Sequence, residues 1–192
     1  GNDGDDAIDG EQGDDLLLGD AGQDYIRGGA GDDLIDGGRD ADIIEGNDNA
    51  DCIKGGGGDD LIYGDNMNPN DPAEGEASDL IDGGNGDDTI YGGEDDDQIN
   101  GGNNDDEIYG NTGDDTIGGD DGEDTIDGGA GDDHINGNDD DDEIFGSGGN
   151  DILAGGEGDD TIKGGQDDDC VAGNEGDDNL FGNVGEDTLD GG

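Results

Sequence analysis

The feature that most constrains this chain is an aliphatic side chain that recurs every nine residues. Stepping by nine from Ile8 leads to Ile62, and after one slip of ten extra residues the series resumes at Ile81 and runs to Leu189. The series has 20 members (15 Ile, four Leu and one Val), and Asp stands two residues before each of them. An array this regular indicates one supersecondary unit stacked on itself, and therefore a solenoid.

Each repeat can be numbered so that the aliphatic residue is position 8, the invariant Asp position 6 and a near-invariant Gly position 1. Position 4 is Gly in 13 repeats, Asp in four, Asn in two and Ala once, at Ala77. Because Asn and Asp tolerate left-handed backbone best after Gly, position 4 is predicted to have a positive φ, and position 2 follows a similar rule. We therefore expect a turn over positions 1–6 and a short strand over positions 7–9 with one side chain pointing inward.

Typical repeats span residues 128–136 (GGAGDDHIN) and 155–163 (GGEGDDTIK). The pattern resembles the RTX (repeats-in-toxin, haemolysin-type) nonapeptide, G-G-x-G-x-D-x-U-x, over the whole chain except one inserted segment. This resemblance implies an all-β fold, a right-handed parallel β-roll with two repeats per coil. Odd and even repeats would then build two facing parallel sheets.

The resemblance also implies calcium between turns of adjacent coils, held by position-6 carboxylates from both turns and by backbone carbonyls of the glycine-rich positions. The implied ligands are Asp6, Asp15, Asp24, Asp33, Asp42, Asp51, Asp60, Asp79, Asp88, Asp97, Asp106, Asp115, Asp124, Asp133, Asp142, Asp151, Asp160, Asp169, Asp178 and Asp187. The chemistry agrees, because calcium takes six to eight hard oxygens in a tolerant geometry. Nine gaps on each side would give about 18 ions. An Asp that only capped a turn would be replaced by Asn or Ser in some repeats, and it never is.

Composition makes an external stabilising ligand necessary. Only 24% of the residues are hydrophobic and the formal charge is −57, values that by themselves predict disorder. About 18 divalent ions would reduce this charge to roughly −21. The acidity excludes nucleic acid as a partner and disfavours anionic membrane surfaces. The chain also has no apolar run approaching the ~20 residues of a membrane span, so membrane insertion is not expected. Position 5 is acidic in 15 of 20 repeats. These side chains would form either an outer layer around the ions or a solvated edge.

We expect residues 1–192 to form a single β-roll that is an excerpt of a longer array. Residues 67–76 contain both prolines and are predicted to loop out of the turn, because proline cannot donate to a strand ladder. This insertion is either a spacer or a contact or processing site, and it does not fit an EF-hand loop. A distorted calcium site is expected near Ala77.

No enzyme is predicted in this segment. The chain has one His (His134), at an outward strand position, and a solid solenoid offers no cleft for a pair of catalytic carboxylates. Cys52 and Cys170 fall on the same sheet six coils apart, too far to form a disulfide within the chain. They are free thiols or cross-link neighbouring molecules.

The sequence thus predicts calcium binding that folds a secreted, non-catalytic segment of a larger extracellular RTX protein, exported from a bacterial cell by a type I-like route as the resemblance implies. The alternative is a repeat of an extracellular fibre, sheath, surface layer or adhesin. All six aromatic residues lie in odd repeats, and Tyr63, Tyr91 and Tyr109 should stack on one exposed sheet face. They either stabilise the sheet through cross-strand contacts or form a docking surface for another roll, a fibre partner or a glycan.

Overall fold

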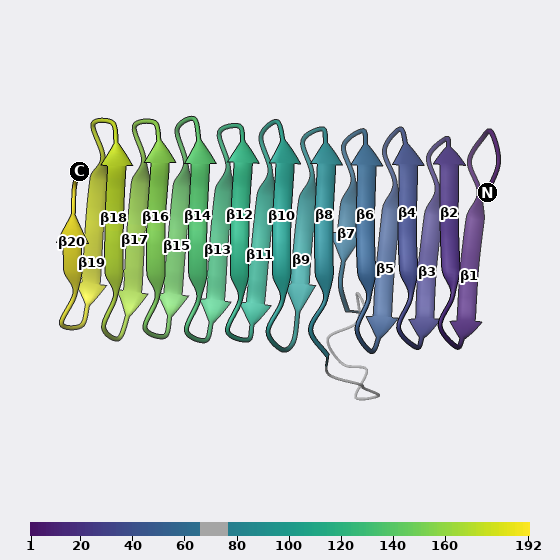
Figure 1. The fold of residues 1–192 in the computed structure, drawn as a ribbon, viewed down its shortest axis with the longest axis horizontal. Coiled ribbons are helices and arrows are strands. Elements are labelled where there is room, and N and C mark those ends of the chain that lie inside the picture. Colours follow the sequence, from purple (N-terminus) through teal and green to yellow (C-terminus); the bar gives the residue numbers. More distant parts are fainter. Residues whose placement is uncertain (66–76) are drawn as a thin grey trace.

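The computed structural model describes residues 1–65 and 77–192, which form twenty β-strands arranged as two ten-stranded parallel sheets (Figure 1). The chain alternates between the sheets, so each pair of consecutive strands makes one coil of a β-solenoid. The sheet of odd strands, called the odd sheet, contains β1 (Ala7–Gln12), β3 (Tyr25–Ala30), β5 (Ile43–Asp48), β7 (Leu61–Tyr63), β9 (Thr89–Gly93), β11 (Glu107–Thr112), β13 (Thr125–Ala130), β15 (Glu143–Gly148), β17 (Thr161–Gln166) and β19 (Asn179–Val184). The all-β, two-sheet architecture predicted from the repeat is confirmed.

The second sheet, called the even sheet, has the same plan. It contains β2 (Leu16–Ala21), β4 (Leu34–Arg39), β6 (Cys52–Gly57), β8 (Leu80–Asn85), β10 (Gln98–Asn103), β12 (Thr116–Asp121), β14 (His134–Asp139), β16 (Ile152–Glu157), β18 (Cys170–Glu175) and β20 (Thr188–Asp190). Among the described residues there is no helix long and apolar enough to cross a membrane.

Neighbouring strands pair residues that occupy the same position in the repeat. Ile108 of β11 pairs with Ile126 of β13, for example, so the register step equals two nonapeptides. Strands on either side of the insertion still pair residues at the same repeat position, since Ile62 of β7 pairs with Ile90 of β9. The predicted insertion itself, residues 67–76, lies outside the described residues.

The strands are longer than the sequence analysis predicted. Most contain six residues, from position 7 of one repeat to position 3 of the next, as in Thr116–Asp121 of β12. The prediction that positions 1–3 belong to the turn is therefore wrong. The reason is cooperative pairing between coils: the register continues at positions 2 and 3, as in Gly102↔Asp120 and Asn103↔Asp121, even though position 2 has positive φ.

The predicted backbone conformation at position 4 is confirmed. Six of the seven non-glycine residues there have φ between 69° and 85°: Asp40, Asn49, Asp95, Asn104, Asp140 and Asp167. The seventh, Ala77, directly follows residues 66–76, which lie outside the described part of the chain. The turn is thus reduced to positions 4–6.

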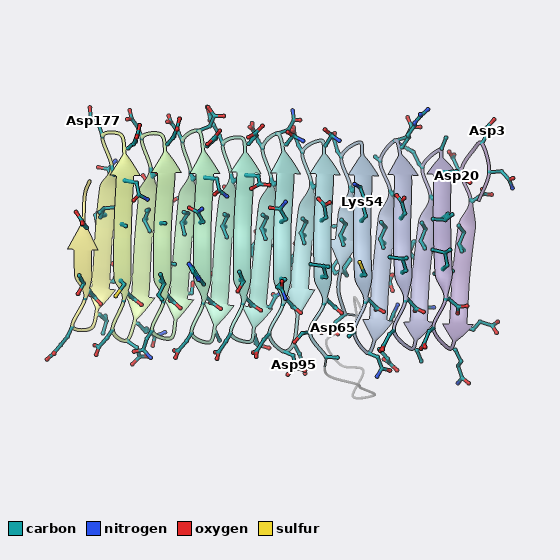
Figure 2. All side chains as sticks on the ribbon, viewed as in Figure 1. Asp3, Asp20, Lys54, Asp65, Asp95 and Asp177 are labelled. Carbon is teal, nitrogen blue, oxygen red and sulfur yellow. The ribbon has the colours of Figure 1, made fainter. Side chains whose placement is uncertain are left out.

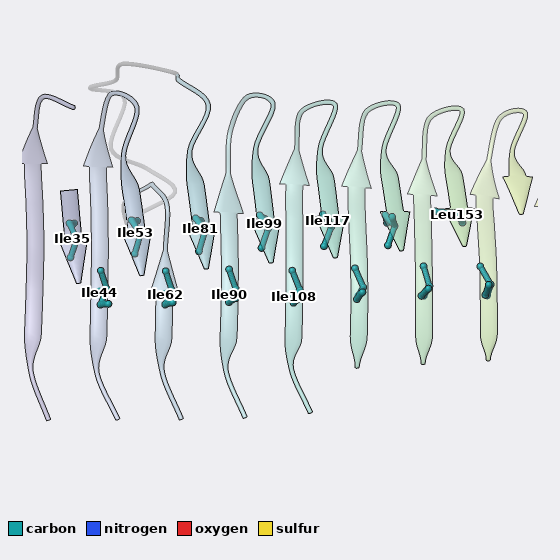
Figure 3. Packing of buried hydrophobic residues seen from close by; sticks show 14 of the residues in the cluster. Ile35, Ile44, Ile53, Ile62, Ile81, Ile90, Ile99, Ile108, Ile117 and Leu153 are labelled. Atoms are coloured by element: carbon teal, nitrogen blue, oxygen red, sulfur yellow. The ribbon is translucent and has the colours of Figure 1, made fainter. Parts of the chain in front are cut away.

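The core is a double file of single aliphatic side chains, one from each strand (Figure 3). Seventeen of the twenty position-8 residues, from Leu17 to Val171, are buried, whereas Ile8 and Leu180 are partly buried and Leu189 is 44% exposed. Apart from this thin core, most of the buried side chains are the aspartates of the turns at the two edges.

Candidate metal centres

The position-6 aspartates lie where each turn enters its strand, so they form one file along each edge of the solenoid. Acidic side chains therefore line both edges (Figure 2). Sixteen of the twenty, from Asp24 to Asp169, are no more than 3% exposed. Asp6, Asp15, Asp178 and Asp187, in the outermost coils, are partly exposed. Carboxylates are rarely buried to this extent without a partner.

One oxygen of these carboxylates connects neighbouring coils. The backbone amide of each position-6 residue donates to Oδ1 of the position-6 residue in the following coil on the same side, as in Asp97 N to Asp115 Oδ1 at 2.8 Å. Eighteen such bonds, between 2.7 and 3.1 Å, occupy all the gaps that the sequence analysis counted, including the gap across the insertion. The eighteen accepting carboxylates, from Asp24 to Asp187, are thereby held in a fixed orientation.

The other oxygen is left without a hydrogen bond. In 17 of the twenty aspartates, Oδ2 is buried and has no partner, the exceptions being Asp6, Asp79 and Asp187. Burying a carboxylate oxygen without a hydrogen-bond partner costs folding free energy. Because the unpaired oxygen recurs at one position of the repeat, it indicates a ligand for a cation.

The glycine at position 1 makes room beside this oxygen. A methyl group on Gly83 would lie 2.5 Å from Asp88 Oδ2 and 2.5 Å from the carbonyl oxygen of Gly101, one coil further on. A carboxylate oxygen and a backbone carbonyl oxygen therefore face the same small space, which only glycine leaves open. Hard anionic and carbonyl oxygens are the donors that calcium prefers.

No protein cation neutralises these carboxylates. The three ion pairs in the described part of the chain involve Glu45, Asp82 and Glu143, none of which is at position 6. Burial, followed by the charges of Asp97 and Asp51, raises the pKa of Asp79 to about 8. Burial likewise raises the pKa of Asp142 to about 8. The two files thus carry a charge that the protein alone does not stabilise.

Position 5 has a role that the sequence analysis did not resolve. Its side-chain oxygen accepts from the position-5 amide of the following coil, as in Asp132 N to Asp114 Oδ1 at 2.8 Å, opposite in direction to the position-6 ladder. These side chains are exposed. They form a solvated edge whose hydrogen bonds also connect neighbouring coils. In the sequence, the only indication of this role was the recurring acidic residue directly before the position-6 Asp.

Most of the expected site geometry persists beside the insertion. Asp51 N donates to Asp79 Oδ1 at 2.8 Å, and Asp79 Oδ2 lies beside Gly64 and the Gly92 carbonyl as in regular repeats. The distorted calcium site expected near Ala77 stays a prediction. Elsewhere, Cys52 and Cys170 lie on β6 and β18 of the even sheet as free thiols, and His134 is exposed, as expected.

The tyrosine stack is confirmed. The rings of Tyr63 and Tyr91 are parallel within 9° with centroids 5.0 Å apart, and those of Tyr91 and Tyr109 within 6° at 4.9 Å. Each ring of the stack covers a face of its neighbour, so the middle ring offers only its edge to solvent.

The residues present fit a cation such as calcium at the coil gaps. No group of three or more His, Cys, Asp or Glu side chains is gathered as a metal cluster within residues 1–65 and 77–192. Between neighbouring coils, position-6 carboxylates and backbone carbonyls instead face the same space, so both side-chain and main-chain oxygens are available as ligands. This donor set suits a hard ion of flexible geometry.

Comparison with known families gives one finding. A family model described as the RTX calcium-binding nonapeptide repeat (4 copies) matches seven stretches, which together leave out only residues 67–74: residues 1–35, 36–66, 75–108, 100–135, 118–153, 145–178 and 164–192. A search among curated proteins found no match.

Proposed function

Because this chain belongs to the RTX calcium-binding nonapeptide repeat family, we propose that its twenty position-6 aspartates bind about 18 calcium ions and that this binding folds the chain. The observation that carries the proposal is the row of 17 buried Oδ2 atoms without partners, 14 of which lie beside the glycine carbonyl of the next coil. Position-6 carboxylates and position-1 carbonyls would hold each ion. The ion would supply the positive charge that the two files lack.

The energetic effect of many weak sites is large. At free calcium tenfold above Kd, each site stabilises the folded state by about 1.4 kcal/mol, and eighteen sites by about 25 kcal/mol. Extracellular calcium modules have Kd values of about 10⁻⁴–10⁻³ M. The chain is thus expected to be disordered at cytosolic calcium and folded outside the cell.

RTX repeats are typical of secreted, extracellular proteins, and we propose this location for the chain, with export in the unfolded state. Residues 1–192 would act as one non-catalytic β-roll within a larger protein. The thin core and the two files of structural carboxylates support this role, because the buried position-6 aspartates share one hydrogen-bonding pattern along each edge. Acid–base catalysis needs carboxylates in different environments.

A calcium titration followed by far-UV circular dichroism tests the proposal. The spectrum should change from disordered to β as calcium rises, whereas magnesium should not substitute, since it demands near-ideal octahedral geometry and gives up water reluctantly. A β spectrum at neutral pH in excess chelator would contradict calcium-dependent folding.

A second candidate is a structural repeat of an extracellular fibre or surface layer that assembles through the odd sheet. The stack of Tyr63, Tyr91 and Tyr109 favours it, since aligned aromatic side chains suit protein interfaces. A glycan ligand is less favoured, because a sugar packs on a free ring face and these faces cover one another. Sedimentation of the triple variant Tyr63→Thr/Tyr91→Thr/Tyr109→Thr in calcium tests this candidate. Loss of assembly at saturating calcium, with the β spectrum retained, supports it, and a wild-type protein that never assembles excludes it.

A further inference from the structure

Position 7, the first residue of each strand, changes character along the chain. In the first eight repeats it is always apolar: Ala7, Leu16, Tyr25, Leu34, Ile43, Cys52, Leu61 and Leu80. In the next seven it is always polar: Thr89, Gln98, Glu107, Thr116, Thr125, His134 and Glu143. Position 7 faces outward, so the core does not require this change. Over the first fifteen repeats it divides this outer row into an apolar part and a polar part.

On the even sheet the apolar part forms a continuous ridge. Leu16, Leu34, Cys52 and Leu80 pair in register on β2, β4, β6 and β8, and we call them the leucine ridge. The three leucines are 64%, 49% and 50% exposed. In a chain with so few hydrophobic residues, four aligned apolar side chains on one face indicate a contact surface.

The same face carries a shallow groove beside the ridge. It is lined by glycines near the ends of β4 and β6 (Gly38, Gly56 and Gly57), by Leu18, Arg39 and Lys54, and by the acidic residues Asp20 and Asp36. The ridge follows the starts of these parallel strands and the groove follows their ends. Ridge and groove therefore run side by side along the solenoid axis, and Lys54 lies between the two edges (Figure 2).

Charge also differs between the two sides of this face. The groove side carries Arg39 and Lys54, two of the four basic residues of the chain, together with Asp20 and Asp36. Arg39 forms no ion pair with any described residue, and Lys54 has only a 3.8 Å contact with the exposed Asp82. The ridge side carries Asp32, which is exposed at position 5 of the turn before Leu34. One face thus contains both members of a complementary pair, in shape and in charge.

We propose that the even sheet of the first four coils is an interface for a second copy of this chain. A two-fold axis parallel to the solenoid would place the leucine ridge of each copy in the groove of the other and bring Arg39 near the partner's Asp32. Such an isologous interface needs a self-complementary patch, which this face provides. A purely acidic partner would be repelled by Asp32 on the ridge side and by Asp20 and Asp36 in the groove. On the odd sheet the row equivalent to the groove walls is filled by Arg27, Glu45 and Tyr63.

The proposal rests on calcium-dependent folding, because the face exists only in the folded roll. The full chain in saturating calcium is examined by sedimentation velocity up to about 0.1 mM, with circular dichroism on the same samples. The wild type should form a dimer. The variant Leu16→Thr/Leu34→Thr/Leu80→Thr should dissociate at least about tenfold more readily while its calcium midpoint barely changes. The matched control is Ile152→Thr, because Ile152 is also at position 7 of the even sheet, is 53% exposed and lies outside the ridge.

Charge exchange gives a second, independent readout. Arg39→Asp should weaken the dimer, and the double variant Arg39→Asp/Asp32→Arg should restore it, because the pair is re-formed with reversed signs. A folded wild-type monomer, or equal losses in the ridge variant and in Ile152→Thr, overturns the interface and leaves calcium binding intact. If calcium does not induce the β spectrum at all, both proposals fail, and circular dichroism shows this directly.

Discussion

The two carboxylate oxygens of Asp133 differ in their relation to Asp115. Its Oδ1 accepts a 2.9 Å hydrogen bond from the backbone amide of Asp115 in the preceding coil, whereas its Oδ2 is buried without a hydrogen-bond partner. The same relationship repeats along both edges. In the folded solenoid, the backbone of one coil thus orients the carboxylate of the next coil. The solenoid therefore presents nearly identical acceptors at every gap.

Replacing Asp133 with Asn should reduce the number of bound calcium ions by about two, because each carboxylate serves the gaps on both sides of its turn. The amide-to-oxygen bond from Asp115 is retained in this variant, so only the charge is lost. Isothermal titration calorimetry measures the stoichiometry. His134→Ala, one residue further and exposed, is the control and should bind as the wild type does. Equal stoichiometry and midpoint in both variants would exclude position 6 as the ligand position.

Replacing Gly83 with Ala should destabilise the calcium-loaded fold by about 1–3 kcal/mol, since the added methyl group occupies the space shared by Asp88 Oδ2 and the Gly101 carbonyl. Urea unfolding in saturating calcium measures the loss. Gly118→Ala is the control, because a methyl group there meets its nearest atom, Asn100 Oδ1, at 3.2 Å. If both variants unfold at the same urea concentration, the space beside position 1 has no special role.

Replacing Tyr91 with Thr should cost about 1–2 kcal/mol and raise the calcium midpoint, because two stacked ring pairs are lost. The effect is expected to matter here because β7, which carries Tyr63, has only three residues and pairs less extensively with β9 than regular strands do. Phe181→Thr provides the comparison, since Phe181 is 49% exposed and belongs to no aromatic pair in the described residues. A Tyr91 variant no less stable than the Phe181 variant would show that the stack is incidental.

Without calcium, the fold should become more stable as the pH is lowered. Burial raises the pKa of Asp97 and Asp106 to about 8 from a usual value of 3.8. Between these values the folded state binds more protons than the unfolded state, so stability is present at low pH and is lost as the pH rises through the folded-state pKa. Circular dichroism of calcium-free protein should show more β structure near pH 5 than near pH 8. The opposite trend would mean that these carboxylates are not buried in the calcium-free fold.

Much of the fold could be predicted because the spacing and residue types within one repeat already define its core residue and its turn conformation. The nine-residue spacing identified the core residues from Leu17 to Val171, and Asp and Asn at position 4 revealed the positive φ there. Both inferences depend only on side-chain periodicity and backbone sterics within one repeat. The candidate ligand position was equally accessible, since Asp stands before every core residue.

Other features depend on contacts between coils. The strands extend through positions 1–3 because the neighbouring coil supplies hydrogen-bond partners there, which one repeat cannot specify. The role of the position-5 carboxylates became clear only when Asp114 was seen to accept the amide of Asp132, 18 residues away.

The sequence by itself determined the solenoid, its core and its two files of aspartate, because a periodic chain has few ways to bury one aliphatic side chain per repeat. Only the tertiary structure decided which oxygen of each carboxylate is left free and which outer side chains share a face. Both follow from the stacking of coils, which places residues 18 or more positions apart side by side. The leucine ridge and its neighbouring groove exist only after that stacking.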